Sequence, residues 1–334
     1  MALPIAVIAA LALTGAALAT FRSPVTASAS FSSATLAAPT GLSVTQSCIP
    51  SSTIAFRSAS TANSSGGLTI SAPADVQAGD VLVAQIAQRA SGSTVTPPAG
   101  WTQVLNNSSG ASLQSTIFVH VAGSSEPTSY TFSSTSSAKS AGGIVAYSGV
   151  DTNNPVNASA GATGASASMT APSVTTTIST TMLVSFWSAR QESFTTPGSM
   201  TQRWNYSAGS GANSSMSVGA ADEAVAAAGA TGTRTASKSS SLDWTAQSIA
   251  LKPKANTQVS LSWTATTSTF ASGYKLERWV GSTMQTQTTI TPASTTSATD
   301  SPLTSGTAYT YKLYSYFRSW TSSQATSTVT AIDC

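Results

Sequence analysis

The sequence predicts an all-β protein, and three features of its composition carry that prediction. Ser and Thr make up about a third of the 334 residues, and together with Val and Gly they favour strands and turns. Charged residues are only 7% of the chain, so the Glu, Lys and Arg that build helical solenoids and coiled coils are missing. Hydrophobic residues still reach 41%, which is enough for packed cores and atypical of a disordered chain.

The first segment, residues 1–19, is predicted to be a secretory signal peptide. Residues 3–19 are apolar, and no charged residue precedes Arg22. Ala17-Leu18-Ala19 supplies a cleavage site, so the mature chain is expected to start near Thr20. The apolar run is too short for a membrane span, and no stable span is expected after cleavage. No Lys or Arg precedes the run, so the positively charged n-region of a signal peptide is absent, as expected if the true start lies upstream. An uncleaved membrane anchor is the alternative.

Residues 20–38 form a strand-like segment without a partner nearby in sequence. Thr20-Phe21-Arg22 and residues 29–36 resemble the mature N-terminus of camelysin and TasA-type biofilm-matrix proteins of Gram-positive bacteria. That resemblance implies an exported bacterial protein that polymerises by donating a strand. The strand-like part, residues 25–36, pairs either with its own domain or with the sheet edge of another molecule. A flexible linker is the alternative interpretation.

The C-terminal part, residues 255–334, contains alternating strand patterns at 259–263, 274–279 and 311–316. Together with Trp263 and Tyr309 it resembles a fibronectin type III domain. The resemblance implies a β-sandwich in which Trp263 lies in the core and Tyr309 forms the tyrosine corner before strand F. A first strand is missing from this stretch, but residues 39–48 have the Pro-x-x-Leu-x-Val pattern of strand A. The domain is therefore predicted to be split, with residues 49–254 inserted after its first strand.

The two cysteines are predicted to form a disulfide. Cys48 ends the first strand and Cys334 the last, and these strand ends meet at one pole of a seven-stranded sandwich. An exported protein can keep such a bond, which would stabilise the fold by at most roughly 5 kcal/mol. Two free buried thiols are the alternative.

The insert is predicted to be a second, larger sandwich of the jelly-roll kind, because short strands alternate with turns rich in Pro, Gly and Asn. A run rich in Ala at 220–230 is interpreted as a strand followed by a loop. Residues 79–84, 98–102, 146–151 and 244–251 resemble a module found beside fibronectin-type repeats in bacterial surface proteins and some phage structural proteins. The predicted strands are 79–90, 101–109, 112–122, 130–133, 143–150, 181–190, 200–206, 214–221 and 242–251.

Catalytic chemistry is hard to find in the chain. His120 is the single histidine, and no Gly-x-Ser-x-Gly elbow is present, so a Ser-His-Asp triad is improbable. Carboxylates that could serve a glycosidase are mostly explained as turn residues, and the neighbours Asp222 and Glu223 should point to opposite faces of a strand. Residues 151–154 suit an Asx turn better than a calcium loop. We expect no enzyme, no cofactor and no bound metal.

Aromatic residues offer a possible ligand platform. Trp187, Trp204, Tyr206 and Trp244, with Arg190 and Arg203, could stack against sugar rings, although packing in the core is the alternative. A net charge of +3 without a basic stripe argues against nucleic acid as a partner. The sequence thus predicts an exported, non-enzymatic surface or matrix protein that adheres to itself or to other surface proteins. The alternative is a carbohydrate-binding module accessory to polysaccharide degradation.

Overall fold

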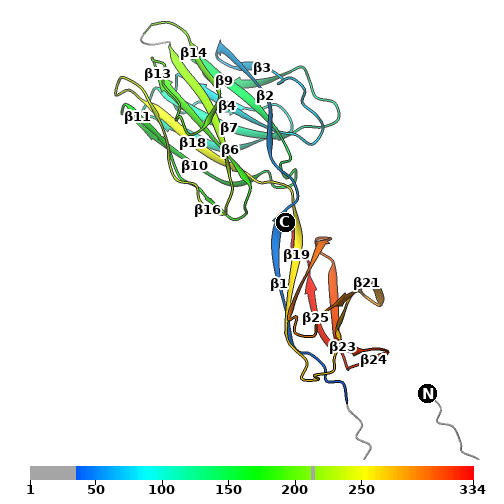
Figure 1. Ribbon diagram of the computed structural model, residues 1–334. Coiled ribbons are helices and arrows are strands. Elements are labelled where there is room, and N and C mark those ends of the chain that lie inside the picture. Colours follow the sequence, from blue (N-terminus) through cyan, green and yellow to red (C-terminus); the bar gives the residue numbers. More distant parts are fainter. Residues whose placement is uncertain (1–34, 212–214) are drawn as a thin grey trace, which may run out of the picture. The chain divides into compact units, whose positions relative to one another are not determined.

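The computed structural model describes residues 35–211 and 215–334, and all regular elements in these residues are β-strands (Figure 1). The prediction of an all-β fold is confirmed. The predicted signal peptide and residues 20–34 of the N-terminal segment lie outside the described residues. Among the residues that are described, no helix has the length and hydrophobicity to cross a membrane.

Two sheets built from both ends of the described chain make a fibronectin type III-like sandwich. The first has the order β1 (Thr40–Pro50), β19 (Ala255–Thr264) and β22 (Ser297–Leu303). The second has the order β21 (Thr283–Ile290), β20 (Gly273–Val280) and β23 (Ala308–Phe317), and β23 also pairs with β24 (Trp320–Thr321) and β25 (Ala325–Thr330). Sheets of strands A-B-E and C′-C-F-G are the fibronectin arrangement, with β1 as strand A.

Strand β1 pairs antiparallel with β19 from Thr40 opposite Thr264 to Pro50 opposite Ala255, so the first strand precedes the insert in sequence. Trp263 is buried and meets Tyr274 edge to face, with ring centroids 5.4 Å apart. The Tyr309 hydroxyl accepts a hydrogen bond from the Thr304 N–H, which is the contact of a tyrosine corner.

The predicted disulfide is confirmed. Cys48 and Cys334 are bonded with Cα atoms 5.5 Å apart, and they are 286 residues apart in sequence. The Thr257 hydroxyl, which donates to the Ile332 carbonyl, lies beside the Cys334 sulfur. The bond therefore joins the ends of the first and last strands, as expected from sandwich geometry.

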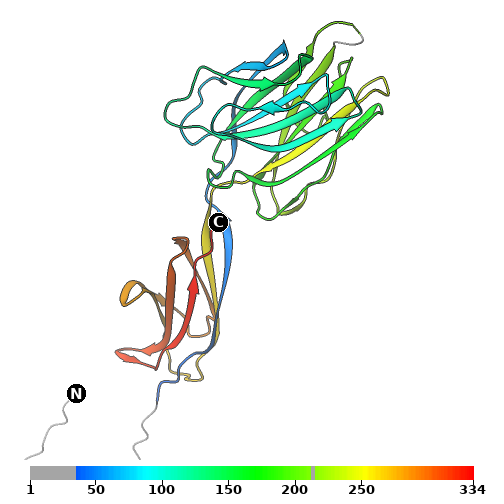
Figure 2. The same ribbon diagram turned by 180° about the vertical axis from the view of Figure 1, so that it is seen from behind.

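Two five-stranded sheets form the centre of the insert (Figure 2). The first has the order β2 (Ala55–Ser65), β9 (Lys139–Ser148), β4 (Val81–Gln88), β7 (Leu113–Val121) and β6 (Trp101–Ser109). The second has the order β10 (Val156–Gly164), β18 (Trp244–Leu251), β13 (Thr181–Arg190), β15 (Met216–Val225) and β14 (Thr201–Ala208). One hydrophobic core contains residues of both sheets, so the sheets pack face to face.

Small sheets cover the outer faces. Strand β8 (Ser129–Ser134) lies between β3 (Leu68–Ser71) and β5 (Val95–Thr96) on the first sheet. On the second, β11 (Ser168–Ala171) pairs with β17 (Arg234–Ser237), and β12 (Thr175–Thr176) pairs with β16 (Gly229–Ala230). The central strands are therefore buried on both faces, which is why every residue of β4 and β18 is buried.

The two large sheets have the same strand order, element for element, when residues 55–148 are compared with 156–251. Even their irregularities recur. A bulge interrupts the pairing after Gln103 in β6 and after Gln202 in β14, and another interrupts β2 and β10 one residue after their Phe56 and Val156 pairs. Because bulges are specific features of a fold, we infer that the insert is an internal duplication.

The repeats also contact each other symmetrically. Strand β6 packs on β10 and β2 on β14, while β7 packs on β18 and β9 on β15, so each contact has its counterpart with the roles exchanged. This is the pattern of a two-fold dimer within one chain. The predicted jelly-roll-like insert therefore consists of two jelly-roll-like repeats. The sequence prediction did not include the strands that complete each repeat, because they are short or rich in small residues. Those strands include β2, β3, β10 and β11.

Candidate interaction surfaces

The predicted aromatic platform is wrong for its three tryptophans. Trp187 has no exposed surface, and Trp204 and Trp244 are each 7% exposed. They also lie in different cores, because Trp204 faces the other repeat whereas Trp187 and Trp244 face the outer sheet of their own. A sugar cannot stack on a ring that has no accessible face. Tyr206 is half-buried, and its hydroxyl receives a hydrogen bond from Asn63.

Arg203 forms an ion pair with the buried Asp222 of its own repeat, where the two repeats meet. Its guanidinium donates to both oxygens of Asp222 at 2.7 Å, and it lies 3.9 Å from the ring centroid of Phe56. Asp222 is 2% exposed and also accepts a hydrogen bond from the Tyr147 hydroxyl at 2.5 Å. Burial and the Asp222 carboxylate raise the pKa of Tyr147 far above its usual range. The Arg203 guanidinium therefore contacts Asp222 and Phe56 inside the protein and does not form part of a sugar-binding platform.

Both ring nitrogens of His120 have a hydrogen-bond partner. Nδ1 lies 2.9 Å from the Gly100 carbonyl oxygen, and Nε2 lies 3.1 Å from the Glu126 carboxylate. The Trp101 ring stacks on the imidazole at 5.2 Å. Burial alone would raise the pKa of Glu126, but hydrogen bonds from Tyr130, the Gly123 N–H and His120 lower it. These contacts hold the His120 ring in place and give it a structural role.

The other carboxylates are also mostly paired. Seven of the eleven Asp and Glu residues form ion pairs with Lys or Arg, each with a different cation, and Glu126 contacts His120. Asp222 and Glu223 take Arg203 and Arg234 as partners, on the inner and outer faces of β15, as the strand alternation predicts. In the described residues no three His, Cys, Asp or Glu side chains are grouped to hold a metal. The lack of an enzymatic function stays a prediction.

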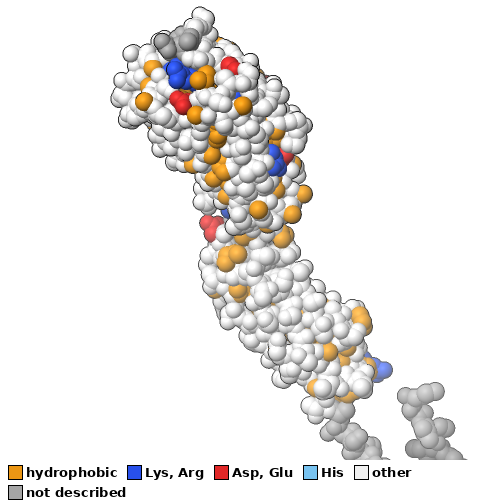
Figure 3. Space-filling view, turned by 90° about the vertical axis from the view of Figure 1, so that its left-hand side faces the viewer, with side chains coloured by type: hydrophobic (Ala, Val, Ile, Leu, Met, Phe, Trp, Pro, Cys, Tyr) orange, Lys and Arg blue, Asp and Glu red, His pale blue; other side chains and the backbone are white. Residues whose placement is uncertain are grey.

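Because the few charges serve internal pairs, the surface is largely uncharged. Figure 3 shows one face on which charged side chains occur in only a few places, between polar and scattered hydrophobic side chains. Such a surface offers hydrogen bonds from Ser and Thr, and its contacts depend little on salt.

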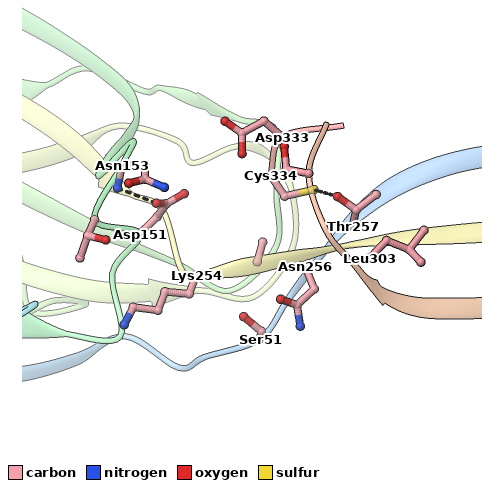
Figure 4. A pocket seen from close by; sticks show the side chains of 12 residues that line it. Ser51, Asp151, Asn153, Lys254, Asn256, Thr257, Leu303, Asp333 and Cys334 are labelled. Carbon is pink, nitrogen blue, oxygen red and sulfur yellow. Dashed lines mark hydrogen bonds between the residues drawn. The ribbon is translucent and has the colours of Figure 1, made fainter. Parts of the chain in front are cut away.

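A polar cavity of about 350 Å³ lies beside the disulfide. Figure 4 shows Asp151 with Asn153, whose backbone N–H donates to the Asp151 carboxylate, and Cys334 with Thr257. Asp151 also accepts from the Asn154 N–H and pairs with Lys252 at 3.0 Å. Burial would raise the pKa of Asp151, but these partners lower it. Residues 151–154 thus form the expected Asx turn, in which the Asp151 carboxylate binds two backbone N–H groups and Lys252.

Strand β21 is the most open strand edge of the fibronectin-like sandwich. Seven of its eight residues are exposed, from Thr283 to Thr289, and its sequence TMQTQTTI has neither charge nor proline. It pairs with β20 on one side, and no described strand pairs with its other side. Natural proteins usually protect such an edge with Lys, Pro or a covering segment. The sequence analysis did not predict β21, because both of its faces are polar and the segment therefore shows no alternation of apolar and polar residues.

Comparisons with known proteins add little. No family model matches the chain, and no curated protein matches it. Among solved structures, the chain is similar to the crystal structure of chicken CNTN1 FN1-FN3 domains, at 10% sequence identity and a TM-score of 0.21, over 86% of this chain and 100% of that chain. The fibronectin-like sandwich therefore rests on the strand pairing described above.

Proposed function

We propose that the protein is an exported, non-enzymatic structural or adhesive protein of a bacterial surface or extracellular matrix, and that its copies associate by strand pairing. The observation that supports this most is the uncovered edge of β21. An added strand would satisfy the free backbone groups of β21 and would meet no like charge, because Thr, Gln and Met are its only exposed side chains.

In this proposal, the strand that pairs with the free edge of β21 is the N-terminal segment of a neighbouring copy. Ala37 is fixed to the sandwich, since its N–H donates to Ser268 and its carbonyl accepts from Thr266 and Ser315. Leu36 is buried. The donated part is therefore confined to the residues before Leu36. Of the predicted strand 25–36, only residues 25–35 are proposed to pair with a neighbouring copy.

Light scattering of the mature chain over a concentration series tests this proposal. We expect large species to form with increasing concentration, and Gln285→Lys in β21 to prevent them by placing a charge on the edge. Ala78→Lys, in an exposed turn of the insert, adds the same charge away from β21 and should not change the assembly. A mature chain that stays monomeric at every concentration would refute self-association.

A further inference from the structure

The Cys48–Cys334 disulfide changes which part of the chain connects the two ends of the described structure. Residues 49–333 lie within the covalent loop that the bond closes, and this loop contains the whole insert and the strands β19 to β25. Before the loop, the described chain runs through β1 to Cys48. The shortest covalent path from Ala37 to Cys334 is therefore β1 followed by the disulfide.

Strand β1 is held firmly along this path. Figure 1 shows β1 beside β19, with which it pairs from Thr40 to Pro50. On its other side the Gln46 side chain bridges to the last strand region, donating to the Thr330 carbonyl at 3.0 Å and accepting from the Ile332 N–H at 3.1 Å. At its start, three hydrogen bonds anchor Ala37. Both ends of this path lie on β1, so a pull acts along the covalent chain of β1, and the hydrogen bonds to its neighbours hold the strand in place.

We propose that the protein transmits tension between Ala37 and Cys334 through β1 and the disulfide, so that residues 49–333 stay outside the load path. This function rests on the proposed structural role at a surface. A strand rises about 3.3 Å per residue and a fully extended chain at most about 3.6 Å, so β1 can lengthen by only a few Å. If the disulfide were absent, unfolding would release the 286 residues of the sequence separation, roughly 1,000 Å of chain.

Single-molecule pulling on the mature chain, with handles at Thr20 and after Cys334, measures this difference directly. For the oxidised protein we expect no unfolding step longer than about 100 Å before the handles detach, because only residues 20–48 can extend. Adding a reductant to the same molecules should release steps that sum to roughly 1,000 Å. The matched variant Cys48→Ser with Cys334→Ser should show the same long steps without reductant.

Two results would overturn the proposal. One is a long step in the oxidised protein, and the other is the lack of any long step in the cysteine-free variant at the same force, since the disulfide would then not be what protects the loop. If that variant does not fold, the reductant experiment on the unmodified chain decides alone. Light scattering reads assembly separately, so a failure of shielding is distinguishable from a failure of self-association.

Discussion

Val104 and Arg203 occupy the same position in two corresponding strands of the duplicated insert. Each is the unpaired residue of a bulge that follows a Thr-Gln pair, in β6 and in β14. The pairing register also identifies equivalent residues on the adjoining strands. Val119 of the first repeat corresponds to Asp222 of the second, and Tyr147 of the first corresponds to Leu251 of the second. One contact between the repeats is thus apolar, while its counterpart is the ion pair of Arg203 with the buried Asp222, to which the Tyr147 hydroxyl donates.

Removing Arg203 should strongly destabilise the protein. Arg203→Ala leaves the buried Asp222 carboxylate without its cation, and a broken buried pair costs about 3–5 kcal/mol. Urea denaturation measures the loss in the free energy of unfolding. Val104→Ala at the equivalent position is the matched control and should cost far less, because no buried charge depends on it. Equal losses for the two variants would contradict this reading of the pair.

Copying the apolar contact into the second repeat should restore stability. The triple variant Arg203→Val, Asp222→Val and Tyr147→Leu introduces the residues that the equivalent positions already carry. Replacing a buried ion pair by well-packed apolar residues is often neutral or stabilising. We expect a free energy of unfolding within about 2 kcal/mol of the unmodified chain, and above that of Arg203→Ala. A triple variant less stable than Arg203→Ala would show that the two contacts are not interchangeable.

Trp204→Ala should act on stability and not on a binding surface. The Trp204 ring packs 6.0 Å from Phe186 and approaches Gly143 so closely that a Cβ there would lie 3.0 Å from the ring. Truncating a buried aromatic side chain costs about 3–5 kcal/mol. Tyr206→Ala, from the half-buried neighbour, should cost less in the same denaturation experiment. A Trp204→Ala protein of unchanged stability would argue against this burial.

Deleting residues 20–34 should leave a folded protein that no longer assembles. The deletion stops before Leu36 and Ala37, which contact the sandwich. Light scattering of the deletion protein should give a monomer, and its thermal unfolding should match that of the full mature chain. Deletion protein that is folded and still polymerises would refute donation of the N-terminal strand.

Acid should destabilise the protein only below about pH 5. Burial would raise the pKa of Glu277, but hydrogen bonds from Tyr314, Trp279 and Gln287 together with Lys312 lower it, and the pKa values of Glu126, Asp151 and Glu192 are lowered too. A carboxyl whose pKa is lower in the folded state adds stability above its unfolded pKa and loses it as the pH falls through the folded pKa.

Denaturation at a series of pH values checks this window. The free energy of unfolding should stay level from pH 7 to about pH 5 and then fall. Glu277→Gln should make the decline shallower, because one of the titrating groups is gone. A decline that begins near neutral pH, or one that Glu277→Gln leaves unchanged, would contradict the assignment.

Local patterns in the sequence were enough to predict much of the fibronectin-like sandwich. Trp263 and Tyr309 lie on strands whose apolar residues alternate, and Cys48 and Cys334 end strands that must meet at one pole. Within the insert, the strands 101–109 and 181–190 were predicted with the observed bounds. In these segments the pattern along the chain is enough to indicate a strand.

Only the tertiary structure decided the duplication, the burial of Trp187, Trp204 and Trp244, and the open edge of β21. Central strands covered on both faces have no polar face, so their sequence does not reveal what lies on either side. Strands such as β10 and β21 lack an apolar period altogether, and their pairing depends on residues far away in the chain. A side chain is buried or exposed according to the layers that pack on its strand, and these layers form only when the whole chain folds.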